Sequence, residues 1–168
     1  MNKIYELIIF LCLVSFPFSI SAHVEHYDNL NRIEFDIYRN NKNIGKHIFS
    51  FNQKDGQLQV ESEINFEIKK LGLVLYKYHV KGTEVYKDGI LIKFNSKTNQ
   101  NGKEKYVNLN LVDDQFQIDG SSHKGKVPTE YLLGTWWNHG LVKAKAQISA
   151  VSGRIIHQKV TFLGKETV

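Results

Sequence analysis

Apolar and polar residues alternate with a period of two along most of the chain after residue 30. The clearest stretch is 57–69, where Leu58, Val60 and Ile64 alternate with polar neighbours. A strand gathers such alternate residues on one face, whereas a helix would scatter them around its surface. The pattern predicts strands near residues 32–39, 46–53, 57–70, 73–87, 90–99, 103–112, 115–119 and 154–163.

Short turn dipeptides separate these stretches: Asp55-Gly56, Leu71-Gly72, Asp88-Gly89, Asn101-Gly102 and Asp119-Gly120. Four of them are Asp-Gly or Asn-Gly, which accept the positive φ angles of two-residue hairpins. We therefore predict a mainly β protein, a long-stranded antiparallel meander that forms a curved sheet or half-barrel. No repeat, low-complexity tract or linker interrupts residues 23–168, so we expect a single β-rich domain there.

Residues 128–140 break the alternation and predict one short helix or turn segment that packs on the sheet. Pro128 suits a first helical turn and Gly140 suits a helix end. Trp136 and Trp137 are adjacent and cannot share a face, so we expect at least one to fill the core under the sheet. The alternative is an exposed platform that stacks on a sugar or another ligand.

The first 22 residues have the pattern of an export signal. Lys3 precedes an apolar run over 7–20, and Ser21-Ala22 offers small residues for cleavage. The run contains Pro17 and is shorter than a spanning helix requires. An uncleaved N-terminal anchor is the alternative. Cys12 follows Phe-Leu instead of small residues, which argues against a lipoprotein.

Cleavage would leave 146 of the 168 residues, without cysteine and without an integral membrane segment. We expect the Gram-negative periplasm as the location. The net charge of +5 comes from lysines spread along the chain, and no arginine cluster indicates nucleic-acid binding.

No nucleophile, phosphate-binding, dinucleotide or metalloprotease motif occurs in the sequence. A disulfide and a cysteine-based zinc site are excluded, because the chain has one Cys. His23 and His26 could together bind a metal, but few carboxylates are nearby. We predict no catalytic residues, no metal and no cofactor, with a hydrolase of unrecognised site as the alternative.

Two-residue turns also fix which residues face each other across the strands. They predict Phe49 opposite Ser62, Ser62 opposite Lys81, and Glu84 opposite Lys93 on the polar face. A three-residue loop at 41–43 is predicted to set Phe35 opposite Phe49. This register places an apolar floor and a polar mouth on one face, and we predict a ligand site there: His47, His79, Lys77, Lys81, Ser62, Ser96, Phe49 and Phe94.

Such a face fits an apolar ligand, or a lipid-like amphiphile whose anionic head meets the lysines. The same pattern is expected if the sheet merely extends beyond its core. A second hypothesis is an envelope structural or assembly protein, acting through a sheet edge or through outward-facing Tyr76, Tyr78 and Tyr86.

Several short motifs resemble those of one family: Tyr38-Arg39-Asn40, Thr83-Glu84-Val85-Tyr86, Asn101-Gly102-Lys103, Trp137-Asn138 and Leu163-Gly164-Lys165-Glu166-Thr167-Val168. The family is an uncharacterised group of exported proteobacterial proteins described only as a domain of unknown function. The resemblance covers residues 32–168. It implies no catalytic residues, and its antiparallel sheet is similar to periplasmic lipoprotein-carrier folds.

Members of that family continue through further strands, whereas this chain stops at Val168 in mid-pattern. The resemblance thus implies a fragment, or a fold completed by a partner chain, with an uncovered sheet edge.

Overall fold

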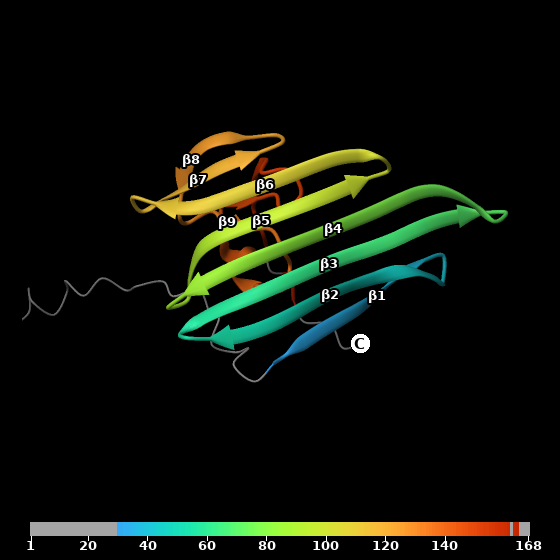
Figure 1. Ribbon diagram of the computed structural model, residues 1–168, viewed down its shortest axis with the longest axis horizontal. Coiled ribbons are helices and arrows are strands. Elements are labelled where there is room, and N and C mark those ends of the chain that lie inside the picture. Colours follow the sequence, from blue (N-terminus) through green and yellow to red (C-terminus); the bar gives the residue numbers. More distant parts are fainter. Residues whose placement is uncertain (1–29, 162, 165–168) are drawn as a thin grey trace, which may run out of the picture.

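The computed structural model describes residues 30–161, 163 and 164, and most of them lie in one antiparallel sheet (Figure 1). Its eight strands follow one another in chain order as a meander that does not close. They are β1 (Arg32–Arg39), β2 (Lys42–Lys54), β3 (Gln57–Lys70), β4 (Leu73–Lys87), β5 (Ile90–Gln100), β6 (Lys103–Val112), β7 (Gln115–Gly120) and β8 (Lys124–Pro128). The predicted mainly β meander is confirmed.

Two-residue turns join β1 through β7, and both turn residues have positive φ in every case. Four of these turns are at the predicted dipeptides. The other two, Asn40-Asn41 and Asp113-Asp114, were not predicted as turns. The prediction for Asp119-Gly120 was wrong, because this dipeptide ends β7 and the chain turns just after it.

Two bulges change the predicted register of β4. Ile68 faces Tyr76 while Lys69 faces Val74, which leaves Leu75 as an extra residue in β4. Because side chains alternate between faces, one extra residue turns over the whole strand beyond it. A second bulge, at Ile92 in β5, restores the predicted faces from there onward.

The predicted β4 pairs were therefore wrong, while those of β2 with β3 were right, as was Phe94 opposite Leu109 between β5 and β6. Ser62 faces Gly82 instead of Lys81, and Phe49 faces Ser62 as predicted. The loop at 41–43 was also wrong. A two-residue turn and a bulge set Phe35 opposite His47, which keeps the predicted face of β1.

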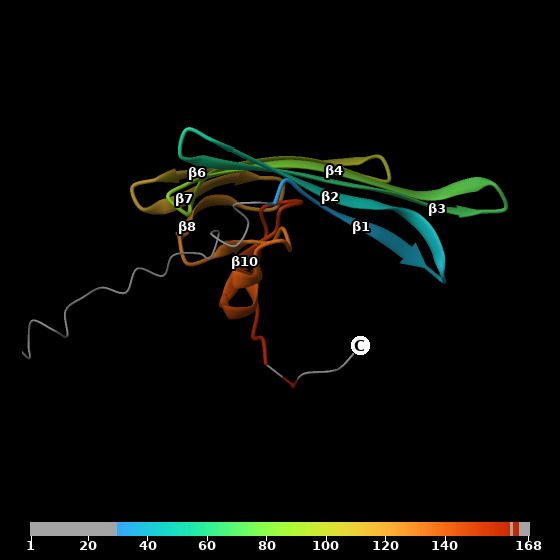
Figure 2. The ribbon, with the colours of Figure 1, turned by 90° about the horizontal axis from the view of Figure 1, so that it is seen from below.

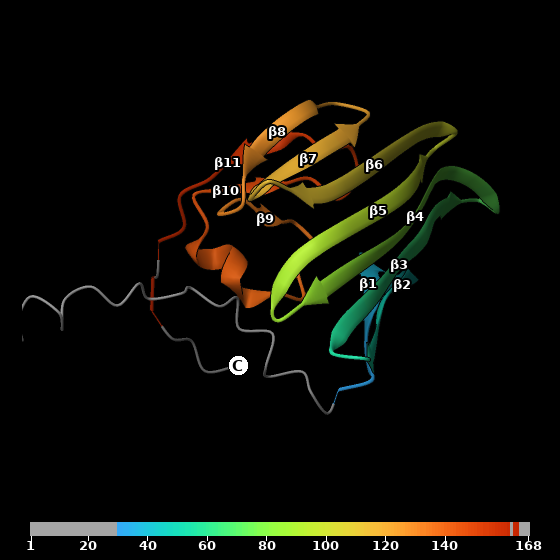
Figure 3. The ribbon, with the colours of Figure 1, turned by 60° about the vertical axis from the view of Figure 1, so that its left-hand side comes forward.

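Residues 129–161, called the covering segment below, pack against one face of the sheet, the inner face (Figures 2 and 3). They contain a small sheet of β9 (Leu132–Leu133), β10 (Ala146–Ile148) and β11 (Ile155–His157), and the 3₁₀ helix η2 (His139–Lys143). The helix or turn predicted over 128–140 thus consists mainly of turns, with β9 inside it. Strand near 154–163 is confirmed only for β11, and β8, β9 and β10 were not predicted.

The hydrophobic core lies between the covering segment and the inner face. Trp137 is 5% exposed and packs edge-on against Phe51 and Tyr86, while Trp136 is 74% exposed. The prediction that one tryptophan fills the core is confirmed. The buried cluster includes Phe49, Phe51, Leu58, Val60, Tyr86, Leu91, Phe94, Val107, Leu109, Phe116, Ile118, Leu133 and Ile148.

Candidate ligand-binding face

The sheet divides the eight predicted site residues between its two faces. Phe49, Phe94, Ser62, Ser96 and His47 belong to the inner face. The remaining three, Lys77, His79 and Lys81, lie on the outer face, because the bulge at Leu75 turns β4 over. A single site built from all eight residues is therefore wrong, and a binding role for either group stays a prediction.

On the outer face the basic residues of β4 meet glutamates of β3. His79 Nε2 lies 2.9 Å from Glu63 Oε1, and Lys77 Nζ lies 2.9 Å from Glu67 Oε1. Hydrogen bonds from His79 lower the pKa of Glu63, and those from Lys77 and Lys69 lower the pKa of Glu67. These carboxylates stay ionised and pair with the basic side chains beside them.

A shallow depression of about 250 Å³ opens on the outer face between β3, β4 and β5. Lys77 and His79 line it together with Asn65 and Asn99. The side chains that line it end in amide and basic groups, which suit water or small polar molecules.

Three of the inner-face residues are buried, two in the core and one in contact with the covering segment. Phe49 and Phe94 are 1% and 0% exposed, so no ligand reaches them in this conformation. The buried Ser96 hydroxyl donates a hydrogen bond of 2.6 Å to the carbonyl of Ala150 in the covering segment. Ser62 lies beside Gly82, in the same cross-strand row as Ser96.

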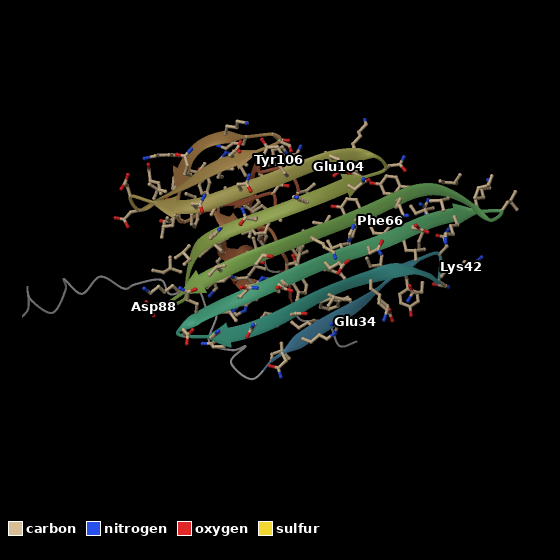
Figure 4. All side chains as sticks on the ribbon, in the orientation of Figure 1. Glu34, Lys42, Phe66, Asp88, Glu104 and Tyr106 are labelled. Carbon is tan, nitrogen blue, oxygen red and sulfur yellow. The ribbon has the colours of Figure 1, made fainter. Side chains whose placement is uncertain are left out.

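Beyond these residues, the covering segment leaves the inner face bare toward the Leu71-Gly72 hairpin (Figure 2). The bare part is rich in aromatic and β-branched side chains, most of them half-buried, and Phe35 is 53% exposed. We call it the open shelf, and it consists of Phe35, Ile37, His47, Ile64, Phe66, Ile68, Tyr76 and Tyr78. Figure 4 marks Phe66 in this half of the sheet.

Ring contacts hold the shelf together. Phe66 lies 5.1 Å from Tyr78 and 6.0 Å from Tyr76 between ring centroids, and His47 lies 4.2 Å from Phe49. Tyr76 and Tyr78 thus face inward, contrary to the outward position predicted for them and for Tyr86, which is buried. Burial lowers the pKa of His47, so its ring is neutral at pH 7 and adds to the apolar surface.

One cation of the inner face, Lys105, lies on β6 beyond the shelf. Lys105 faces Thr98, in the cross-strand row of Val80, Ile64 and His47. The Lys105 ammonium donates a hydrogen bond of 2.6 Å to Gln100 Oε1, which keeps it beside this face.

Glu84 is a buried ionisable residue that the sequence reasoning placed on the polar face. It is 0% exposed in the inner-face core, opposite Phe94 and not Lys93. Trp137 Nε1 donates to Oε1 at 2.9 Å, and the Tyr86 hydroxyl donates to Oε2 at 2.5 Å. Burial raises the pKa of Glu84 to about 7 despite these hydrogen bonds. The carboxyl therefore ties the covering segment to β4 and is shielded from any substrate.

The alternation within β4 itself contained a signal for this arrangement. Its even-numbered residues include Tyr76, Tyr78, Val80 and Tyr86, whereas its odd-numbered residues include Lys77 and other basic side chains. The more apolar set faces inward, as hydrophobic burial requires.

Among residues 30–161, 163 and 164, no cluster of three or more His, Cys, Asp or Glu could hold a metal ion. The described part of the chain also contains no helix with the length and apolar character needed to cross a bilayer. The predicted signal over 1–22 and the pair His23 and His26 lie outside the described residues.

These features define an open antiparallel β-sheet module whose inner face is only partly covered. A family model described as a domain of unknown function, DUF6134, matches residues 35–168, and the chain belongs to this family. The match confirms the expected uncharacterised domain. Neither a curated protein nor a solved structure matches the chain.

Proposed function

We propose that this protein is an exported, non-enzymatic β-sheet module that binds an apolar or anionic amphiphilic molecule on the open shelf. The observation that carries the proposal is the continuous apolar and aromatic surface that the covering segment leaves bare. A contiguous apolar surface in contact with water is typical of binding sites, because burying it in a complex removes it from water. Neutral His47 adds to this surface without introducing a charge.

We assign Lys105 to an anionic headgroup, because it lies on the inner face in the cross-strand row of the shelf residues Ile64 and His47. This assignment replaces Lys77 and Lys81, whose positions on the outer face separate them from the shelf by the thickness of the sheet. A ligand would lie along β1 to β4 with its chain on Phe35 and Phe66 and its head toward Lys105.

Titration of the protein with a dansyl-labelled long-chain fatty acid tests this function. We expect the double substitution Phe35→Ser with Phe66→Ser to weaken binding by at least about tenfold, since two apolar contacts are lost. Val112→Ser is the matched control, because Val112 is 42% exposed on the outer face of β6. Equal affinity of the double variant and the wild type would refute the shelf as the site.

The substitutions Lys105→Glu and Lys81→Glu distinguish binding on the inner face from binding on the outer face. We expect Lys105→Glu to weaken binding of the fatty acid but not of its methyl ester, and Lys81→Glu to change neither. The reverse result would place the ligand on the outer face.

Export to the periplasm is part of the proposal and rests on the pattern of residues 1–22. Mass spectrometry of the protein from a cell-envelope preparation should give a chain that begins near His23. A full-length chain recovered from the cytoplasm would refute export.

A protein partner in the cell envelope is the second candidate function, and edge strand β1 favours it. Within residues 30–161, 163 and 164, β1 pairs only with β2 and presents an unpaired backbone edge along Arg32–Arg39. Such an edge can accept a strand from another protein. Asp36→Pro should abolish co-purification of a partner that binds in this way and leave fatty-acid binding intact, because Asp36 is not part of the open shelf.

A further inference from the structure

We propose that the β3–β4 hairpin inserts its tip into the surface of a membrane that contains anionic phospholipid. The tip carries Leu71, Leu73, Val74 and Leu75, which are 94%, 70%, 51% and 55% exposed. A contiguous group of large exposed apolar side chains indicates a surface that is buried in a complex. The hairpin extends beyond its neighbours at the end of the sheet, so the tip is convex (Figure 1).

The turn residue at the tip is unusual in this sheet. The other two-residue turns that join β1 through β7 begin with Asn or Asp, whereas this one begins with Leu71 at a φ of 52°. Asn and Asp tolerate the left-handed conformation through local hydrogen bonds, which leucine cannot make. The Leu71 side chain gains no burial within the described residues, so its own packing there does not offset this cost.

Lysines surround the apolar tip. Lys69 and Lys77 keep 57% and 59% of their side chains exposed, and Lys70 is also exposed. Residues 67–77 carry a net charge of +2, because Glu67 opposes three lysines. Leucines that enter a bilayer interface and lysines that meet its phosphates together bind anionic membranes.

The distribution of charge along the sheet also favours contact between this end of the sheet and an anionic membrane. The two other hairpins at this end, residues 37–44 and 97–105, also carry +2 each. At the opposite end, residues 52–59 and 85–92 are neutral and residues 110–117 carry −2. Figure 4 marks Lys42 at the basic end and Asp88 at the opposite end. An anionic surface therefore attracts the end that carries the apolar tip.

The tip adjoins the open shelf through Leu75 and Tyr76, so the variants that test it change no shelf residue. Its test is sedimentation of the protein, as the cell produces it, with vesicles of phosphatidylglycerol and phosphatidylcholine. We expect Leu71→Ser with Leu73→Ser to lower the partition coefficient by at least about tenfold. Ile90→Ser is the matched control, because Ile90 is 54% exposed beside a hairpin at the acidic end. All variants share one N-terminus, so residues 1–22 contribute equally.

The charge contribution is tested with Lys70→Glu, and Lys87→Glu at the acidic end is its control. We expect Lys70→Glu to reduce binding several-fold at low salt and far less at high salt, where screening is strong. Vesicles of phosphatidylcholine alone should bind weakly. The proposal is overturned if the wild type does not bind anionic vesicles. In that case the tip would instead contact a protein partner. It is also overturned if the serine pair binds like the wild type, or if Ile90→Ser loses as much binding.

Discussion

Substitution of Glu84 by glutamine should remove a pH dependence of stability that the buried carboxyl creates. The folded protein keeps this carboxyl protonated up to a pKa of about 7, whereas its ordinary value is 4.5. Between these values the unfolded chain releases the proton and the folded chain retains it. Rising pH therefore favours unfolding, and the contribution of Glu84 to stability is greatest below pH 4.5 and lost above pH 7.

The magnitude follows from the two pKa values. Stability should fall by about 1.4 kcal/mol for each pH unit in this window, which gives about 2.5 kcal/mol between pH 5 and pH 8. The glutamine side chain of Glu84→Gln would imitate the neutral acid, because its carbonyl can accept from Trp137 while its amide can donate to the Tyr86 oxygen. The variant should thus be more stable than the wild type at pH 8 and similar to it at pH 5.

The measurement is urea unfolding of both proteins at several pH values, followed by tryptophan fluorescence and far-UV circular dichroism. Other titrating groups act equally in both proteins, so the difference in free energy of unfolding isolates Glu84. Glu67→Gln is the control. Its carboxylate has a lowered pKa and stays ionised in both states between pH 5 and pH 8, so the difference should be flat.

Tyr86→Phe adds a second readout. The Tyr86 hydroxyl lowers the pKa of Glu84, so its loss should move the pH window upward. A difference between wild type and Glu84→Gln that stays constant from pH 5 to pH 8 would refute the reasoning, because a solvated or permanently ionised Glu84 gives that result.

Three further predictions concern the sheet and its covering segment. Trp137→Ala should lose about 3 to 5 kcal/mol of unfolding free energy, because Trp137 is buried in the core. Trp136→Gly should stay within about 1 kcal/mol of wild type, since Trp136 is exposed with a φ of 72°. Similar losses for the two variants in chemical denaturation would contradict this packing. Gly45→Ala should lose about 1 to 3 kcal/mol, because a Cβ there would lie 2.1 Å from the Asn65 carbonyl oxygen, and an unchanged melting temperature would mean that β2 and β3 lie further apart. Deletion of Leu75 should remove the bulge and leave the core intact, so tryptophan fluorescence should be unchanged, and a red-shifted emission would show that β4 had turned over instead.

The sequence predicted the sheet well because its signals are local. The bounds of β1, β3, β4 and β6 agree with the predicted ranges, since alternation and turn dipeptides act within a few residues. The small strands β9 and β10 were not predictable in this way. They have two and three residues, and contacts with distant parts of the chain hold them in place.

The candidate site was less predictable, because it depends on the bulges. No turn dipeptide or other local pattern predicts the bulge at Leu75. This one extra residue places Lys77, His79 and Lys81 on the outer face. The inner-face positions of Phe49 and Phe94 were predictable, since the β2–β3 register has no bulge and the bulge at Ile92 offsets the one at Leu75. Glu84 is buried for the same reason, because the bulge at Leu75 turns this part of β4 over.

The links between the sheet and the covering segment have a consequence for the order of folding. Neighbouring strands of the meander are joined by turns of two or three residues, whereas Trp137 reaches Glu84 across 53 positions and Ala150 reaches Ser96 across 54. Local contacts form with little loss of chain entropy, and distant ones form later. We therefore expect the hairpins to pair before residues 129–161 pack on them, so that the Glu84 carboxyl stays hydrated until Trp137 covers it.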